Sequence, residues 1–207
     1  MLARQNGCPW DKRTCAFAAQ GGHLEVLARK NECPWAEQTC TFAAQGGHLE
    51  VLARQNKCPW DEWTCARAAE SGHLAVLQWA RENECPWDES VCCYAACGGH
   101  LDVFKWVRKN GCPWNKRTCE YAARDGRLAA LARQNGCPWD KGTCRIAAAN
   151  GHLHVLKWAR QNECPWDEST CHDAALHNHL DVFNWARQNG CPCSVSLDVW
   201  FPVGMNE

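Results

Sequence analysis

The sequence has almost no net charge and no long apolar run. Its 22 Lys and Arg residues nearly balance its 23 Asp and Glu residues, and the formal charge of -1 argues against nucleic acid or an anionic membrane surface as a partner. No stretch approaches the roughly 20 consecutive apolar residues that span a bilayer. The first residues, MLARQNGCPWDKR, also lack the apolar run of a secretory signal. We therefore expect a soluble, intracellular protein located in the cytoplasm.

Motifs that carry chemistry are also missing. The sequence contains no glycine-rich phosphate loop, no nucleophile elbow and no HExxH motif. These absences disfavour nucleotide-dependent, acyl-transfer and zinc-protease chemistry. We expect a protein that is not an enzyme and that uses no cofactor and no small-molecule substrate.

Cysteine, in contrast, is abundant and periodic. The chain has 18 cysteines, a composition that on its own suggests a secreted disulfide framework or a metal protein. The dipeptide Cys-Pro, however, recurs every 25 or 27 residues, at Cys8, Cys33, Cys58, Cys85, Cys112, Cys137, Cys164 and Cys191. The chain is thus a repeat array over residues 1–192, with seven full repeats in residues 8–190, a partial repeat at each end and a degenerate tail over residues 193–207.

The repeat at residues 58–84, CPWDEWTCARAAESGHLAVLQWARENE, predicts a short first helix. Asp61 follows a Pro-Trp turn, and its carboxylate can cap the first turn of a helix that begins there. The small side chains of Cys65, Ala68 and Ala69 form a narrow face that allows a neighbouring helix to approach closely.

A second helix follows after Gly72, which can adopt the left-handed conformation common beyond a helix C-terminus. In the segment LAVLQWAREN, apolar residues cover most of the helix circumference, so this helix must be buried between neighbours. Two helices of about ten residues cannot bury their apolar faces alone, and stability must come from stacking on adjacent repeats. We predict an all-α fold, an α-solenoid of stacked helix-turn-helix repeats.

The segment TCARAAESGHLAVLQWARENECP resembles the ankyrin repeat, whose common pattern is TPLHxAAxxGHxEVVxLLLxxGAD. The match recurs as AAQGGHLEVL in residues 18–27 and 43–52, as AACGGHLDVF in residues 95–104 and as AAANGHLHVL in residues 147–156. Shortened repeats of this CPWD type look like arrays found in large DNA viruses and in some algae and protists. The resemblance covers nearly the whole chain and implies a stacked helical array that presents a binding surface.

Two departures from the ankyrin pattern affect the expected structure. A typical ankyrin repeat has about 33 residues, and this repeat lacks about six of them where the family's β-hairpins lie, so we expect a tight CPWD turn without a full hairpin. The TPLH histidine is also missing. We expect a ladder of recurring tryptophans to cover the edge that hairpins would otherwise protect. Its members are Trp10, Trp35, Trp60, Trp87, Trp114, Trp139 and Trp166.

Most repeats place a histidine at the start of the second helix. The six positions are His23, His48, His73, His100, His152 and His179. An active site is needed once, whereas a structural device is needed in every repeat. We therefore expect these side chains to serve in turns and packing.

Each full repeat has two cysteines separated by six residues, such as Cys58 and Cys65. Structural zinc commonly uses closer pairs, and Cys65 lies in an apolar stripe where cysteine packs as a small hydrophobe, so we favour packing over metal or disulfide. Equivalent cysteines of successive repeats are expected about 8–10 Å apart, beyond disulfide reach. A link within one repeat, such as Cys58 to Cys65, is the remaining disulfide candidate.

A local cluster of Cys92, Cys93 and Cys97 offers a candidate site for a soft metal, because Cys93 and Cys97 are one helical turn apart. The sequence offers no clear fourth ligand. We interpret the cluster as cysteine substitutions at exposed variable positions and predict no metal site.

The outward positions of the first helix vary between repeats, as expected where stacking constrains only the framework. Aromatic and basic residues of the kind enriched in interfaces gather there. The candidate partner-binding residues are Trp63, Arg67, Tyr94, Arg117 and Tyr121. We predict a non-enzymatic protein–protein interaction scaffold whose partner is another protein, and a solvated face without a partner is the alternative for these residues.

Two other functions are also compatible with the sequence. The paired cysteines suggest a zinc-binding or redox-responsive repeat protein. The chain also has features of a truncated fragment of a larger ankyrin-repeat adaptor, because it starts inside a helix and ends without the polar capping repeat that solenoids need for solubility.

Overall fold

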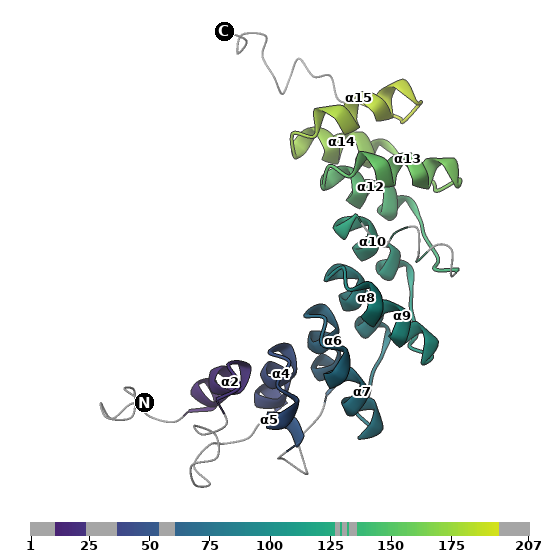
Figure 1. Ribbon diagram of the computed structural model, residues 1–207. Coiled ribbons are helices and arrows are strands. Elements are labelled where there is room, and N and C mark those ends of the chain that lie inside the picture. The colour runs from purple at the N-terminus through teal and green to yellow at the C-terminus, as the bar shows by residue number, and fades with distance from the viewer. Residues whose placement is uncertain are drawn as a thin grey trace. The chain divides into compact units, whose positions relative to one another are not determined.

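The computed structural model describes residues 11–23, 37–53, 61–126, 129, 132 and 136–194. Two compact parts, Met1–Pro113 and Trp114–Glu207, are described separately below as the N-terminal part and the C-terminal part. Within the described ranges the regular secondary structure is entirely helical (Figure 1), in agreement with the predicted fold class. None of the helices in those ranges has the length and apolar character needed to cross a membrane.

The N-terminal part contains helices from four repeats. The first helices are α2 (Lys12–Gln20), α4 (Glu37–Gln45), α6 (Glu62–Glu70) and α8 (Glu89–Cys97), and the second helices are α5 (Leu49–Ala53), α7 (Leu74–Glu82) and α9 (Leu101–Lys109). Successive first helices pack against one another in the pairs α2–α4, α4–α6 and α6–α8. Each described second helix packs against the first helix of its own repeat.

The C-terminal part has the same arrangement. Its first helices are α10 (Lys116–Asp125), α12 (Lys141–Ala149) and α14 (Glu168–Leu176), and its described second helices are α13 (Leu153–Gln161) and α15 (Leu180–Gln188). The pairs α10–α12 and α12–α14 join successive repeats, while α12–α13 and α14–α15 pack within a repeat. The predicted α-solenoid is therefore confirmed within each part.

An aspartate or asparagine side chain caps most of the first helices. In α6, the backbone amide and the hydroxyl of Thr64 each donate a hydrogen bond to the Asp61 carboxylate at 2.9 Å. The equivalent caps are Asp11, Asp88, Asn115, Asp140 and Asp167. Because the first amides of a helix have no intrahelical acceptor, these side chains determine where α2, α6, α8, α10, α12 and α14 start.

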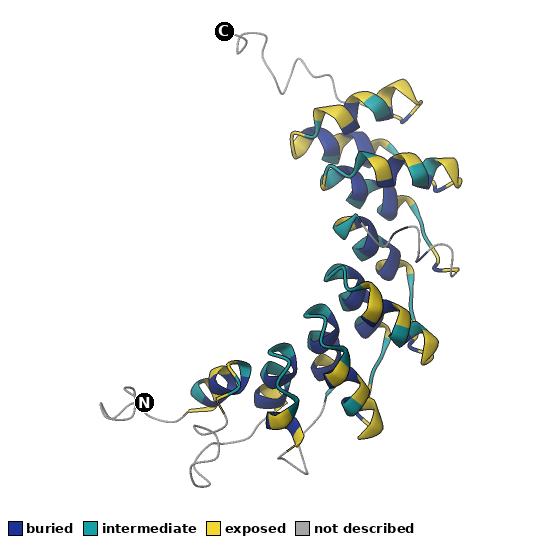
Figure 2. Ribbon diagram, in the orientation of Figure 1, coloured by how far each residue is buried: buried dark blue, intermediate teal, exposed yellow. Residues whose placement is uncertain are grey.

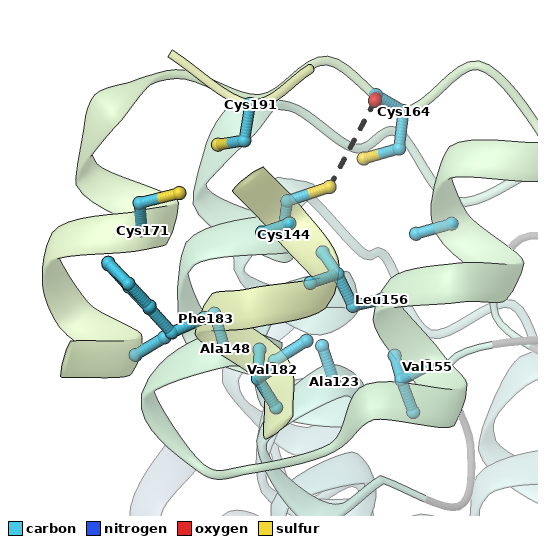
Figure 3. Close-up of a cluster of buried hydrophobic side chains, with 14 of the residues drawn as sticks. Ala123, Cys144, Ala148, Val155, Leu156, Cys164, Cys171, Val182, Phe183 and Cys191 are labelled. Atoms are coloured by element: carbon cyan, nitrogen blue, oxygen red, sulfur yellow. Dashed lines mark hydrogen bonds between the residues drawn. The ribbon is translucent and has the colours of Figure 1, made fainter. Parts of the chain in front are cut away.

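Small side chains form the contact face between first helices. Cys65, Ala68 and Ala69 of α6 are completely buried, as are their equivalents in neighbouring repeats. Figure 2 shows that the described helices carry buried segments in both parts. The second helices contribute larger apolar side chains. In the C-terminal part, Leu156 of α13 and Phe183 of α15 complete one continuous core cluster (Figure 3).

Histidines connect neighbouring repeats, in agreement with the predicted role in turns and packing. Nε2 of His73 lies 3.0 Å from the carbonyl oxygen of Gln45, the last residue of α4. The same contact joins His48 to Gln20 at 2.9 Å and His152 to Arg124 at 2.8 Å. Because a carbonyl oxygen only accepts, Nε2 is the donor, and it satisfies a carbonyl that has no partner within its own helix.

Three tryptophans of the predicted ladder pair with a tryptophan of a second helix. The ring of Trp87 meets the ring of Trp106 in α9 edge to face, with centroids 5.9 Å apart, and the Arg81 guanidinium lies 4.1 Å from the Trp87 centroid. Trp139 and Trp158 pair at 5.4 Å, and Trp166 and Trp185 at 6.0 Å. These turn tryptophans are therefore held by the second helix of their own repeat. Trp10, Trp35 and Trp60 lie outside the described residues.

Candidate interaction surface

Three of the predicted partner-binding residues form one cluster on α6 and α8. The rings of Trp63 and Tyr94 meet edge to face, with centroids 5.9 Å apart. The Arg67 guanidinium carbon lies 5.8 Å from the Trp63 centroid and 5.5 Å from the Tyr94 centroid, within the range where a cation is attracted to an aromatic ring. We name these three side chains the α6–α8 aromatic cluster.

The α6–α8 aromatic cluster is held in place but open to solvent. Nη1 of Arg67 donates to Oε2 of Glu70 at 2.6 Å, an ion pair between residues one turn apart on α6. Trp63 is 45% exposed, while Arg67 and Tyr94 are half-buried. An indole with this much surface in water offers apolar area that a partner can cover.

A groove continues the surface from the cluster over α4. This α4–α6 groove has a volume of about 510 Å³ and includes two residues of the cluster, Trp63 and Arg67. Its other lining residues are Glu37, Gln38, Thr41, Phe42, Gln45 and Asp61. The lining combines aromatic rings with carboxylates and amides, so it offers both apolar contact and hydrogen bonds to a polypeptide segment.

The other two predicted residues, Arg117 and Tyr121, lie on α10 in the C-terminal part. They line a second groove, the α10–α12 groove, which has a volume of about 500 Å³. Its remaining lining residues are Glu120, Arg124, Ile146 and Asn150. Two guanidinium groups against one carboxylate give this groove a basic character. The five residues that were predicted to form one face therefore lie on two surfaces, one in the N-terminal part and one in the C-terminal part.

Comparison of the repeats did not identify Gln45, Arg124 and Asn150 as lining residues. All three lie at the C-terminal end of a first helix, whereas the prediction used positions nearer the start of that helix. The signal was present, because the last position of the first helix differs between repeats, as Gln45, Glu70 and Arg124 illustrate.

Some variable positions also join neighbouring repeats. Phe17 of α2 and Phe42 of α4 meet edge to face at 5.7 Å, although Phe17 stays 55% exposed. Nη1 of Arg145 lies 3.0 Å from the Asp173 carboxylate in the next repeat. The outward face therefore contributes to stacking while it still exposes aromatic area.

The cysteine cluster does not occupy exposed positions. Cys92 and Cys93 are 0% and 4% exposed, and Cys97 is half-buried. The prediction of exposed positions was wrong because α8 packs against both α6 and α9, so its Cys92 and Cys93 face neighbouring helices. Within the part of the chain that the structure describes, no group of three or more His, Cys, Asp and Glu side chains is placed to hold a metal ion.

Two cysteines depart from the predicted packing role. Cys15 and Cys40 are each disulfide-bonded, and each holds the first-helix position that Cys65 holds in its own repeat. Cys65 itself is a buried thiol whose sulfur contacts Cys85. Cys58, the predicted partner of Cys65, lies outside the described residues.

Comparisons with known proteins give no assignment. No protein-family model matches the chain, and a search of curated proteins finds no match either. The resemblance to the ankyrin repeat rests on the sequence motifs quoted above.

Proposed function

We propose that this chain is a non-enzymatic protein-interaction scaffold, an ankyrin-like array that binds another protein through the outward side of its first helices. The observation that carries this proposal is the α6–α8 aromatic cluster, where Trp63 is 45% exposed beside an ordered guanidinium. Trp, Tyr and Arg are the residue types that contribute most to binding at protein interfaces.

The two grooves support the same proposal. Both the α4–α6 groove and the α10–α12 groove lie between the first helices of successive repeats. Their lining residues differ, whereas the buried Cys, Ala and Thr positions recur. In a stacked array, this division allows the surface to vary while the framework is preserved.

The chemistry of the α10–α12 groove indicates the kind of segment that fits it. The guanidinium groups of Arg117 and Arg124 favour carboxylates, and the side chains of Tyr121 and Ile146 favour apolar contacts. We propose a partner segment that carries both acidic and apolar side chains.

The test compares the wild-type chain with the triple variant Trp63→Ala, Tyr94→Ala and Tyr121→Ala. A partner captured by the wild-type chain is identified and purified, and its affinity for both chains is measured by isothermal titration calorimetry. We expect the triple variant to bind at least roughly 30-fold more weakly, because truncating one interface anchor costs on the order of 2 kcal/mol. Its melting temperature should change little, because Trp63 is exposed and the two tyrosines are only half-buried.

A matched control removes exposed apolar side chains from the second helices. Leu101 of α9 and Leu180 of α15 are 44% and 39% exposed, and the variant Leu101→Ala with Leu180→Ala should bind like the wild type. Equal affinity of the triple variant and the wild type, at an unchanged melting temperature, would exclude the proposed surface.

A further inference from the structure

Pairs of cysteines connect successive repeats in the N-terminal part. Sγ of Cys65 in α6 lies 3.1 Å from Sγ of Cys85, which opens the next repeat, and both residues are completely buried. In the following pair, Sγ of Cys92 lies 3.8 Å from the carbonyl oxygen of Cys112. Both pairs have the same spacing of 20 residues, so they are one recurring feature of the array.

The C-terminal part contains the same pairs. Figure 3 shows Cys144 beside Cys164 and Cys171 beside Cys191, with their sulfur atoms directed toward each other. The Cys144 thiol donates to the carbonyl oxygen of Cys164 at 4.0 Å. Cys171 and Cys191 are both buried free thiols.

Backbone contacts determine the position of the cysteine that opens each repeat. The Cys85 amide donates to the carbonyl of Ala80 in α7 at 2.9 Å, and the Cys85 thiol donates to the carbonyl of Asp61 at 3.7 Å. Cys164 makes the equivalent contacts with Ala159 at 3.0 Å and Asp140 at 3.4 Å. Backbone carbonyl groups that recur in the array therefore hold the cysteine that opens each repeat. The cysteine on the first helix of the preceding repeat lies next to it.

The first-helix cysteine position is compatible with a disulfide in this fold. Cys15 and Cys40, which hold this position in their own repeats, each take part in a disulfide. For Cys65 and Cys85, a bond requires the two sulfurs to approach by about 1 Å, to the usual S–S distance of about 2.05 Å. Side-chain rotation at two adjacent buried residues can supply a movement of this size.

We propose that Cys65 and Cys85 form a disulfide that links one repeat covalently to the next under oxidising conditions. The equivalent disulfide sites are Cys92–Cys112, Cys144–Cys164 and Cys171–Cys191. These sites lie in the buried core, apart from the exposed aromatic residues of the proposed interaction surface. The inference is therefore independent of the proposed function.

Oxidised glutathione is a suitable oxidant for this reaction. One protein thiolate attacks a sulfur of oxidised glutathione and releases one glutathione thiolate. The second protein thiolate then attacks the protein sulfur of the mixed disulfide and releases the second glutathione. Two protein thiols and one oxidised glutathione thus give one protein disulfide and two molecules of reduced glutathione.

Burial slows this exchange in the folded array. The hydrogen bond with Cys65, together with burial, raises the pKa of the Cys85 thiol, so little thiolate is present at neutral pH. In the next pair, the hydrogen bond with Cys112, together with burial, raises the pKa of the Cys92 thiol in the same way. We therefore expect the disulfides to form during folding or when a repeat opens, and to be shielded from reductants afterwards.

The test maps the disulfides formed on refolding. The full chain is reduced, unfolded and refolded in a glutathione redox buffer, its remaining thiols are blocked with N-ethylmaleimide, and its proteolytic peptides are identified by mass spectrometry without reduction. We expect a cross-linked peptide pair that contains Cys65 and Cys85 and disappears on reduction. Alkylation of both residues, or a bond from Cys65 to any other cysteine, overturns the proposal.

Two variants serve as a matched pair, because each removes one buried thiol from a first helix. Cys93→Ala should keep the Cys65–Cys85 cross-link, and alanine fits there because the preceding repeat has the buried Ala66 at the same place. Cys65→Ala should leave Cys85 alkylated, and a Cys85 cross-link to another cysteine in this variant would contradict the assigned pairing. The Cys65–Cys85 cross-link is first looked for in the wild-type chain. A variant that fails to fold therefore does not change the conclusion about that cross-link.

Discussion

Nε2 of His73 donates a hydrogen bond to the carbonyl oxygen of Gln45, 28 residues earlier in the chain and one repeat away, at 3.0 Å. The carbonyl belongs to the last residue of α4, where it has no partner within the helix. The same imidazole lies against Gly47. One side chain thus closes the end of a first helix and sets how closely the next repeat approaches it.

Replacing His73 by alanine should destabilise the array. The Gln45 carbonyl would lose its donor at a partly buried site, which costs about 1–3 kcal/mol. Urea denaturation of the full chain should show this loss as a lower midpoint, whereas Gln78→Ala, at an exposed position of α7, should leave the midpoint nearly unchanged. An unaltered midpoint for His73→Ala would mean that water replaces the imidazole at no cost.

Gly47→Ala and Gly111→Ala separate backbone strain from steric contact. Both glycines have a φ of +77°, so alanine is strained at either position and should cost about 1 kcal/mol. A Cβ on Gly47 would lie 2.7 Å from the His73 ring, whereas a Cβ on Gly111 meets no atom within 4 Å. We expect the larger loss of stability for Gly47→Ala.

The double variant Gly47→Ala with His73→Ala checks this interpretation. Removing the ring relieves the steric contact, so the double variant should lose less stability than the sum of the two single variants. Additive losses, measured by the same urea denaturation, would show that the imidazole does not limit the size of the residue at Gly47.

The ion pair between Asp167 and Lys141 should make the stability of the array depend on pH. The hydrogen bond and charge of the Lys141 ammonium, 2.7 Å away, hold the pKa of this carboxyl below its usual value of 3.8. A lowered folded-state pKa contributes stability above the unfolded pKa, and the contribution is lost as the pH falls through the folded pKa. Asp167→Asn should therefore be less stable than the wild type at neutral pH, and the difference should vanish in strong acid.

Asparagine is the suitable replacement at Asp167 because it also caps helices, as Asn115 does in α10. The variant therefore isolates the charge. The difference in melting temperature should also shrink as salt is added, because the ion pair is largely exposed, with Lys141 67% accessible. A difference that stays constant between neutral and acidic pH would assign the effect to the cap and not to the charge.

The proposed disulfides predict a stability that depends on redox state. A bridge that closes a loop of about 20 residues stabilises a protein by about 3 kcal/mol through the unfolded chain. The refolded, oxidised chain should have a higher urea midpoint than the same chain after reduction by a phosphine. The difference should be smaller in Cys65→Ala than in Cys93→Ala, and equal midpoints of the oxidised and reduced chains would contradict the prediction.

The amino-acid sequence by itself determined the repeat period, the helical fold class and the start of the first helices. These features depend on local chemistry: Asp61 caps the helix that follows it, and the small residues from Cys65 to Ala69 make a face that only another helix can cover. The recurring histidines were also assigned correctly to turns and packing, because repetition marks a structural role.

The tertiary structure alone decided which residues meet between repeats. Periodicity gives the spacing of equivalent positions, and on that basis equivalent cysteines were not expected to form disulfides with one another. The contacts that form join positions that are not equivalent, as in Cys65 with Cys85, Trp87 with Trp106 and His73 with Gln45. Their distances depend on how two helices and a turn pack in three dimensions, and this packing cannot be read from the interval between identical motifs.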